Sequence, residues 1–508
     1  MESESYFLLV LIIIIFLLLM LIMHVLNYNL TQKLPPGPRK LPIIGNLHQL
    51  AAAGSLPPRS FRELAKKYGP IMHLKLGENP TVVISSPELA MEILKTHDSC
   101  FLKRPRILAA ESFSFGSSDI AFAPCGEMWR QLRKICTLEL LSVERVRSLS
   151  RVREEESVKF IESIRESSGS AVNLKTMIFS LISASVYRSA FGKIPEDKNE
   201  IDEFVSLIRK AIEMGSGFYL CDLFPSVKPL YYVTGMKFKV ERMKKKLEKI
   251  FENIITEHQH KQVNVGGDNA KEEEDLVDVL LRLHKNSSTT HQFHITTNTI
   301  KAVIMDIFAA GTDTSASTLE WAMSEMVRNP RVMAKSQAEV REAFRGKQRI
   351  HESDVDKLSY LKSVIKETLR LHPPTPLLIP RECTERNTIG GYEIGVGTRV
   401  MVNAWAMGRD PEYWHDAEKF IPERFDGNCS IGFRRTSFEY LPFGAGRRIC
   451  PGIAFGLATI MFPLALLLYH FNWELPSAMK PEDLDMTEHF GLAMERKNDL
   501  CLIPSLVM

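Results

Sequence analysis

A loop near the C-terminal end constrains the fold of this chain more than any other stretch. Residues 443–452 read Phe-Gly-Ala-Gly-Arg-Arg-Ile-Cys-Pro-Gly, and a long apolar run follows them. Glycines let the backbone turn tightly and approach a flat ligand, and N–H groups at the start of a helix favour a thiolate at Cys450. A neighbouring arginine can bind a carboxylate through a planar, multidentate contact. Each of these parts has a chemical reason if Cys450 binds a haem iron; a buried cysteine in a glycine-rich turn is the alternative.

The same loop resembles the haem-binding signature of the cytochrome P450 family, Phe-x-x-Gly-x-Arg-x-Cys-x-Gly, at all five fixed positions. The resemblance implies haem b as the cofactor, with Cys450 as its axial thiolate and Arg448 as a propionate contact. It also places Phe443 and Gly444 in the haem-binding loop. A thiolate ligand pushes electron density onto the iron and favours O–O cleavage. The hypothesis that follows is oxygen activation.

Composition excludes several other classes of protein. The net charge of +3 is too small in a chain of 508 residues to suggest nucleic acid as a partner. The eight cysteines include no Cys-x-x-Cys, so a zinc site is not expected. Nothing in their spacing resembles a disulfide framework, which favours reduced thiols in the cytosol.

The N-terminal segment predicts a membrane anchor. Residues 7–23 form an unbroken run of seventeen apolar residues, which meets the lower limit for a helix that crosses a bilayer. A cleaved signal peptide is the alternative, but Glu2 and Glu4 precede the run and no small-residue cleavage site follows it. The first positive charges come after the run, beginning at Lys33, so the positive-inside rule places the rest of the chain in the cytosol.

These features divide the chain into three parts. Residues 1–25 are expected to form a luminal tip and transmembrane anchor, and residues 26–40 a linker. The linker contains Leu-Pro-Pro-Gly-Pro at 34–38, whose prolines favour a stiff, extended spacer. This segment resembles the proline-rich hinge of microsomal members of the family. Residues 41–508 are expected to form the catalytic domain.

A second motif lies inside a long helix that is expected from Thr297 to Asn329. Residues 310–315 read Ala-Gly-Thr-Asp-Thr-Ser, and glycine and hydroxyl residues are costly in a helix interior. A local rule broken in mid-helix often marks a functional site, although a small-residue packing seam is the alternative. The segment resembles the distal motif of the family. That resemblance implies that Thr314 and Asp313 deliver protons to the dioxygen that the enzyme activates.

Further haem contacts are implied by the resemblance. Trp129 and Arg133 lie four residues apart in a helical stretch and therefore share one face. In the family this Trp-x-x-x-Arg pair contacts the haem propionates, and Arg381 matches another propionate arginine. A surface arginine over an aromatic ring is the common alternative for the first pair.

Two further patterns concern the core. Glu367 and Arg370 are i,i+3 neighbours on a predicted helix from Tyr360 to Leu371, and in the family the arginine of Pro-Glu-Arg-Phe, here Arg424, joins them in a structural trio. The apolar run 453–469 is long enough to suggest a second membrane span. Its Gly456 and Pro463, and the cysteine that precedes it, favour a buried core helix instead.

The resemblance extends from the anchor to the final residues and implies a mainly α fold with a small β-rich portion. Among family members the chain is most like plant microsomal (A-type) hydroxylases of specialised metabolism. Such enzymes sit in the endoplasmic reticulum membrane by a single span, with a cytosolic catalytic domain. They take electrons from NADPH through NADPH–cytochrome P450 reductase. Two rivals remain: a member that rearranges peroxides, which would typically lack Thr314, and a haem protein that only carries gas or electrons.

The expected substrate contacts are mostly apolar. By alignment with the substrate-contacting regions of the family they are Phe113, Ala309, Ala310, Leu377, Leu378, Phe490 and Leu492. None brings a lysine or arginine, so a small uncharged lipophile is favoured. Among plant relatives a terpenoid is the first choice, and flavonoids and indole alkaloids are the alternatives.

Overall fold

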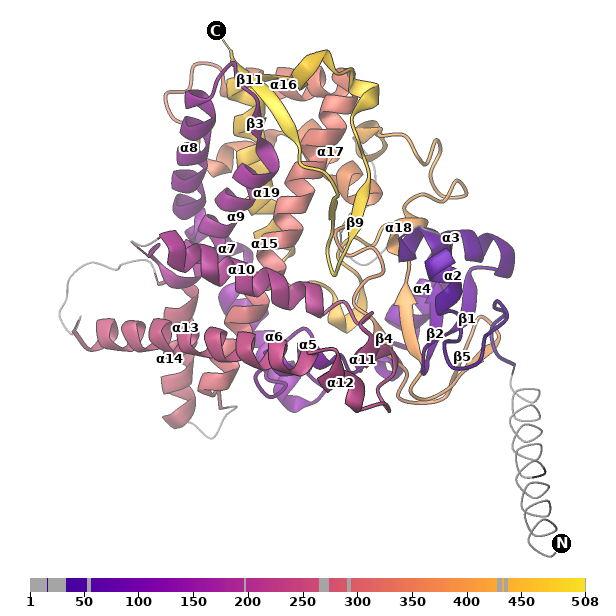
Figure 1. Cartoon of the computed structure of the whole chain (residues 1–508). Helices are drawn as coiled ribbons and strands as arrows, with labels where there is room; N and C mark the ends of the chain where they lie inside the picture. Colours follow the sequence, from indigo (N-terminus) through magenta and orange to yellow (C-terminus); the bar gives the residue numbers. More distant parts are fainter. Residues whose placement is uncertain are drawn as a thin grey trace, which may run out of the picture.

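The computed structural model describes residues 16, 33–52, 56–195, 198–264, 274–289, 294–426, 432–433 and 437–507. Apart from Phe16, the expected anchor (residues 1–25) lies outside the described residues, and the linker is described from Lys33 onward. The described part is mainly helical with small β-sheets, as the sequence predicts (Figure 1).

The helices account for most of the described chain. Their bounds are α2 Leu47–Ala52, α3 Pro57–Tyr68, α4 Pro87–Met91, α5 Leu108–Phe113, α6 Glu127–Ile135, α7 Val143–Ser148, α8 Ser150–Glu166, α9 Leu174–Phe191, α10 Lys198–Met214, α11 Leu220–Leu223, α12 Pro229–Val233, α13 Met236–Asn264, α14 Leu276–Thr289, α15 Thr297–Arg328, α16 Pro330–Phe344, α17 Ser359–Leu371, α18 Ala404–Met407 and α19 Ile453–His470.

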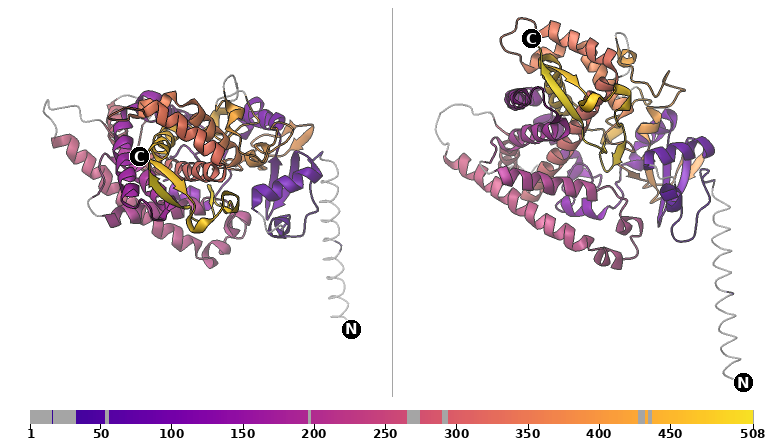
Figure 2. Two further views of the ribbon diagram at one scale, coloured as in Figure 1. Left: turned by 90° about the horizontal axis from the view of Figure 1, so that it is seen from above. Right: turned by 45° about the horizontal axis from the view of Figure 1, so that its top comes forward.

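The strands form small sheets. Their bounds are β1 Ile71–Leu76, β2 Asn79–Ile84, β3 Val172–Asn173, β4 Arg381–Glu382, β5 Asn387–Ile389, β6 Tyr392–Ile394, β7 Arg399–Val402, β8 Phe471–Glu474, β9 Glu488–Phe490, β10 Met494–Arg496 and β11 Cys501–Leu506. The largest sheet has the order β1-β2-β7-β4, in which only β2 and β7 run parallel. It lies with α2, α3 and α4 to one side of the helical body, as all views show (Figures 1 and 2).

Helix α15 runs through the centre of the molecule. Thr296 caps its start: its side chain accepts a hydrogen bond from the Thr299 backbone, and Thr299 reciprocates. Asn329 ends it, because Pro330 has no N–H to continue the ladder and begins α16 instead. Most of α15 is buried against α9, α19 and α17. This central position fixes the motif at 310–315 in the core.

Helix α19 is the apolar run that follows Cys450. Among the described residues it is the helix long and apolar enough to cross a membrane, but 61% of its apolar window is buried inside the protein. It packs against α15, α16 and α8 around Pro463. The predicted core helix is therefore confirmed.

Candidate active site

The Cys450 loop lies between a short helical turn at Gly446–Arg448 and the start of α19. Gly446 has φ +72°, and a Cβ there would lie 2.0 Å from the Leu94 carbonyl oxygen, so only glycine fits. The Cys450 backbone N–H donates to the Phe443 carbonyl at 3.0 Å, which closes the loop. Burial raises the pKa of the Cys450 thiol, while the Gly452 N–H and Arg133 lower it. A coordinated metal cation would deprotonate such a thiol outright.

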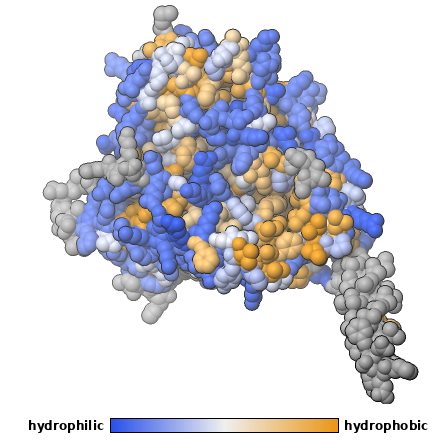
Figure 3. Space-filling view, in the orientation of Figure 1, coloured by the Kyte–Doolittle hydropathy of each residue, from blue (hydrophilic) through white to orange (hydrophobic). Residues whose placement is uncertain are grey.

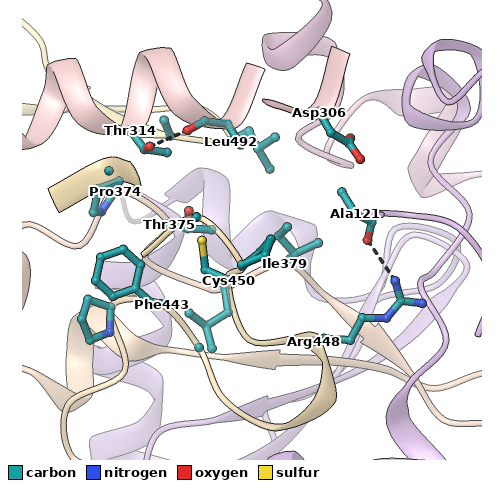
Figure 4. A pocket seen from close by; sticks show the side chains of 18 of the residues that line it. Ala121, Asp306, Thr314, Pro374, Thr375, Ile379, Phe443, Arg448, Cys450 and Leu492 are labelled. Carbon is teal, nitrogen blue, oxygen red and sulfur yellow. Dashed lines mark hydrogen bonds between the residues drawn. The ribbon is translucent and has the colours of Figure 1, made fainter. Parts of the chain in front are cut away.

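Cys450 opens onto a cavity of about 320 Å³. The walls are supplied by the Cys450 loop, by α15 and by the segment from Pro374 to Ile379. In Figure 4 the Cys450 sulfur points toward α15, which carries Thr314 across the cavity. Phe443 and Gly444 line the same cavity as Cys450.

Among the described residues, four arginines line this cavity: Arg104, Arg133, Arg381 and Arg448. Burial, together with the neighbouring Arg381 and Arg133, lowers the pKa of Arg448 to about 10. Arg448 donates to the Ala123 carbonyl at 2.6 Å, and Arg381 pairs with Asp98 at 2.5 Å. Clustered guanidinium groups with few carboxylates between them suit a dianionic ligand. The residues present therefore fit haem b, whose two propionates such groups can hold.

Arg133 lines the cavity, whereas Trp129 does not. Both lie on α6, and the Arg133 guanidinium carbon is 5.7 Å from the centre of the Trp129 ring. Arg133 reaches the cavity and donates to the Ile449 carbonyl beside the cysteine. Trp129 stands behind the cavity wall, with Arg448 stacked 4.2 Å from its centre and its indole N–H on the Ile120 carbonyl.

Asp313 and Thr314 both line the cavity from α15. Thr314 donates its hydroxyl hydrogen to the Ala310 carbonyl at 2.5 Å, the backward bond expected of a hydroxyl in mid-helix. The Asp313 side chain is buried. Burial, together with nearby Glu495, raises the pKa of Asp313 to about 7. The pair therefore combines a hydroxyl with a carboxyl group that exchanges protons near neutral pH.

The sequence reasoning missed Asp306 and Arg104. Asp306 lines the cavity, and one of its oxygens accepts the Ile120 N–H at 2.7 Å, which ties the loop before α6 to α15. Burial and the nearby Asp119 raise the pKa of Asp306. An acid inside the apolar run from Val303 to Phe308 was a signal that could have identified it. Arg104, in Lys-Arg-Pro-Arg, carries no such signal.

The expected substrate contacts divide into two groups. Ala309, Ala310, Leu378 and Leu492 line the cavity. The other three lie outside its wall. Leu377 and Phe490 pack with Phe61 and the β1–β2 strands in a separate core, and Phe113 belongs to the main helical core. Leu378 has a positive φ of 51° and lines the cavity, whereas its neighbour Leu377 packs in the separate core.

The structure brings Glu367, Arg370 and Arg424 into contact. Glu367 and Arg370 form a fully buried bidentate pair with N–O distances of 2.7 Å. Arg424 joins Glu367 at 3.2 Å. Arg370 also donates to the Ala417 and Lys419 carbonyls, which fastens the segment before residue 420 onto α17.

Comparison with known proteins identifies the family. Residues 35–502 match the family described as Cytochrome P450. The chain is a cytochrome P450. It is 59% identical to Cytochrome P450 71D8 of Glycine max, with 94% of each chain covered. It is also 53% identical to the premnaspirodiene oxygenase of Hyoscyamus muticus, with 93% of each chain covered.

Other comparisons agree with this family. The P450 is 49% identical to the amorpha-4,11-diene 12-monooxygenase of Artemisia annua, over 94% of this chain and 93% of that one. A solved structure of a zebra fish cytochrome P450 with progesterone has a TM-score of 0.75 and covers 89% of this chain and 100% of that one. At 24% identity that likeness shows the fold alone. The protein is thus a plant-type cytochrome P450 monooxygenase, a family that implies a haem-thiolate centre.

Proposed function

We propose that this P450 inserts one oxygen atom into a terpenoid, most specifically a sesquiterpene hydrocarbon. The observation that carries the proposal is one cavity with Cys450 at one wall and the Asp313–Thr314 pair at another, bounded by apolar side chains such as Ala309 and Leu492. Relatives at 49% and 53% identity are named for the oxidation of amorpha-4,11-diene and premnaspirodiene. A hydrocarbon needs no charged partner, and burial of its apolar surface supplies the affinity.

Each site residue then has a role. Cys450 would hold the haem iron, and Arg104, Arg133, Arg381 and Arg448 would hold its propionates, with Trp129 supporting Arg448 from behind. When bound, a thiolate-ligated haem supplies the oxygen-activating chemistry. Ala309 and Ala310 leave room for substrate beside α15. Thr314 positions a proton at its Oγ, and Asp313 replenishes that proton from its carboxyl group.

The overall reaction consumes two electrons and two protons. R–H, O2, NADPH and H⁺ give R–OH, H2O and NADP⁺. We propose NADPH–cytochrome P450 reductase as the electron donor, as the resemblance implies. The protons must reach a cavity whose walls are mostly apolar, which gives Asp313 and Thr314 their importance.

We also propose the endoplasmic reticulum membrane as the location, with the catalytic domain in the cytosol and residues 1–25 as anchor. Figure 3 shows hydrophobic side chains gathered on the face over β1, α11 and α12. Exposed apolar residues of α11 and α12 include Leu220, Tyr232 and Val233 at 82%, and the segment that bridges to β1 at Gly45 exposes Leu41 and Ile43, the latter at 78%. An exposed apolar patch of this kind is favoured at a bilayer surface.

The test is microsomal expression of the full chain with a plant reductase and a panel of sesquiterpenes, flavonoids and indole alkaloids. We expect NADPH-dependent hydroxylation of a sesquiterpene. When the reaction is run under isotopically labelled O2, the product should carry one labelled oxygen atom. Turnover confined to flavonoids or alkaloids would overturn the substrate class. Conversion of a hydroperoxide without NADPH would indicate a peroxide-rearranging enzyme, and haem loading without turnover of any compound would favour a carrier.

A further inference from the structure

A second cavity, of about 230 Å³, adjoins α15. Its walls include Lys175 on α9, Arg209 on α10, Asp313 and Glu320 on α15, and Glu495 on β10. Among the described residues only Asp313 lines both this cavity and the one that contains Cys450. A polar cavity of this size can hold several water molecules. Asp313 therefore lies between two cavities. One is the apolar cavity that contains Cys450, and the other is this second cavity with its charged lining, which we call the chamber.

Glu320 faces the same chamber as Asp313. The two acids are seven residues apart, which is almost two turns, so they share one face of α15 at a rise of about 10 Å. Glu320 is only 2% exposed, and its Oε1 atom accepts no hydrogen bond. The nearest cation, Arg496, lies 3.6 Å from that oxygen and donates its hydrogen bonds to the Asp485 and Asn498 carbonyls instead. A buried carboxylate oxygen without a hydrogen-bond partner, on an acid that lines a cavity, calls for an explanation.

Charged groups surround both acids. Arg209 pairs with Glu495 at 2.6 Å, and Lys175 lies 3.7 Å from the same carboxylate. Arg209 is 37% exposed at the side-chain level, so this pair connects the chamber to solvent. The groups facing Asp313 are Glu495, Arg209 and Glu213, and those facing Glu320 are Lys175, Arg496, Glu495 and Asp499.

Both acids are suited to exchanging protons near neutral pH. Burial, followed by nearby charges, raises the pKa of Asp313 to about 7. Burial also raises the pKa of Glu320 to about 7, against the opposing effect of Lys175. Groups with a pKa near the working pH transfer protons most efficiently.

We propose that the chamber is the proton inlet of this P450 and that Glu320 is the group that relays protons through it to Asp313. The ionised Glu320 carboxylate takes up a proton that bulk solvent delivers as hydronium, which leaves water and a carboxylic O–H, and Glu320 then releases that proton through water to the Asp313 carboxylate. Asp313 then passes its proton toward the hydroxyl group of Thr314 and returns to its ionised form. Each transfer moves one proton and changes no oxidation state. The inference rests on the proposed function, since only a proton-consuming reaction needs such an inlet.

The test compares Glu320→Gln, Glu320→Asp and the matched control Glu325→Gln. Glu325 is also a buried acid of α15, but it pairs with His372 at 2.7 Å and lines neither cavity. With a substrate that wild type turns over, we expect Glu320→Gln to lower the coupled rate about 100-fold, the lower end of what a positioned acid contributes. Hydrogen peroxide and the solvent isotope effect should rise, the substrate KM should stay unchanged, and Glu320→Asp should recover part of the coupling.

Equal coupling and an equal isotope effect in Glu320→Gln and wild type would overturn the relay while leaving the proposed function intact. So would the same loss of coupling in Glu325→Gln, because that would indicate a general packing effect. Absence of oxygenation in wild type would instead concern the proposed function.

Infrared titration of the haem-loaded protein tests the relay without turnover. Among the buried carboxylic C=O bands, we expect one from Asp313 and one from Glu320 that disappear as the pH rises through about 7, since both acids have a pKa near that value. Asp313→Asn should remove one band and Glu320→Gln the other. If Glu320→Gln left the bands that titrate near neutral pH unchanged, Glu320 would not be a proton carrier.

Discussion

Asp313 is an acid placed where burial opposes its charge. Its side chain is 6% exposed, and its pKa rises from 3.8 to about 7. A folded-state pKa above the unfolded value means that the folded protein binds the proton more tightly. The stability contribution is therefore fully present below about pH 3.8 and is lost as the pH rises to about 7.

Replacing Asp313 by Asn should show how much the buried, ionised carboxylate destabilises the folded protein. We expect Asp313→Asn to be more stable than wild type at pH 8, by about 4 kcal/mol at most. A rise in the pKa of Asp313 from 3.8 to about 7 corresponds to that difference in the free energy of unfolding. The difference should shrink toward pH 4, where the acid is protonated in the folded protein and about half protonated in the unfolded chain. Thermal unfolding of the haem-loaded proteins at both pH values measures it, and a variant less stable than wild type at pH 8 would contradict the burial argument.

Thr314 follows that acid in the sequence and lines the cavity beside it. Thr314→Val keeps the shape and removes the hydroxyl that donates to Ala310. We expect near-normal haem content and substrate binding, continued NADPH oxidation, and much of the flux diverted to hydrogen peroxide, because positioned acid–base groups contribute about 10²–10⁴-fold. Product and peroxide yields per NADPH measure the effect. Full coupling would leave Thr314 as a packing residue.

Helix α15 shows what sequence can predict for a whole element. Its expected span, Thr297 to Asn329, matches the observed Thr297–Arg328, because the cap at Thr296 and the proline at 330 act locally. Short sequence patterns do not predict contacts between residues that lie far apart in the chain. Arg104 is held at the cavity by hydrogen bonds that it donates to the Ala121 and Ile379 carbonyls. Leu377 lies outside the cavity, in the separate core beside β1 and β2. Neither fact is encoded in neighbouring residues.

The same helix presents Ala309 and Ala310 to the cavity. Ala310→Phe adds a ring to the wall that also carries Thr314. We expect it to block or redirect oxidation, by filling space, without abolishing carbon monoxide binding. Product regiochemistry for Ala309→Phe and Ala310→Phe provides the measurement. Unchanged turnover and regiochemistry in both variants would place the substrate elsewhere.

The whole molecule combines a central helical core with a β-rich part beside it (Figure 1). The sequence predicted this mainly helical class and the motifs that meet at the cavity, because each motif carries a distinct chemical requirement. It did not predict the second cavity beside Asp313, whose walls come from α9, α10, α15 and β10. Such a chamber depends on how distant elements pack.

The anchor is expected to be separable from the catalytic body. Deletion of residues 1–25 should weaken membrane attachment and leave haem incorporation intact, because the prolines at 35, 36 and 38 make a stiff spacer. Fractionation of expressing cells, with the haem spectrum of each fraction, measures this. Cleavage of the first residues from the full-length protein in cells would indicate a signal peptide instead.

The central claim is that Cys450 is the haem ligand, and its most direct test is the carbon monoxide spectrum of the reduced protein. We expect wild type to show the red-shifted Soret band of a thiolate-ligated haem and Cys450→Ser to lose it. Cys100→Ser is the matched control, since Cys100 is also half-buried but does not line the cavity, and it should keep the band. A red-shifted band retained in Cys450→Ala would mean that another cysteine binds the iron and would contradict the account.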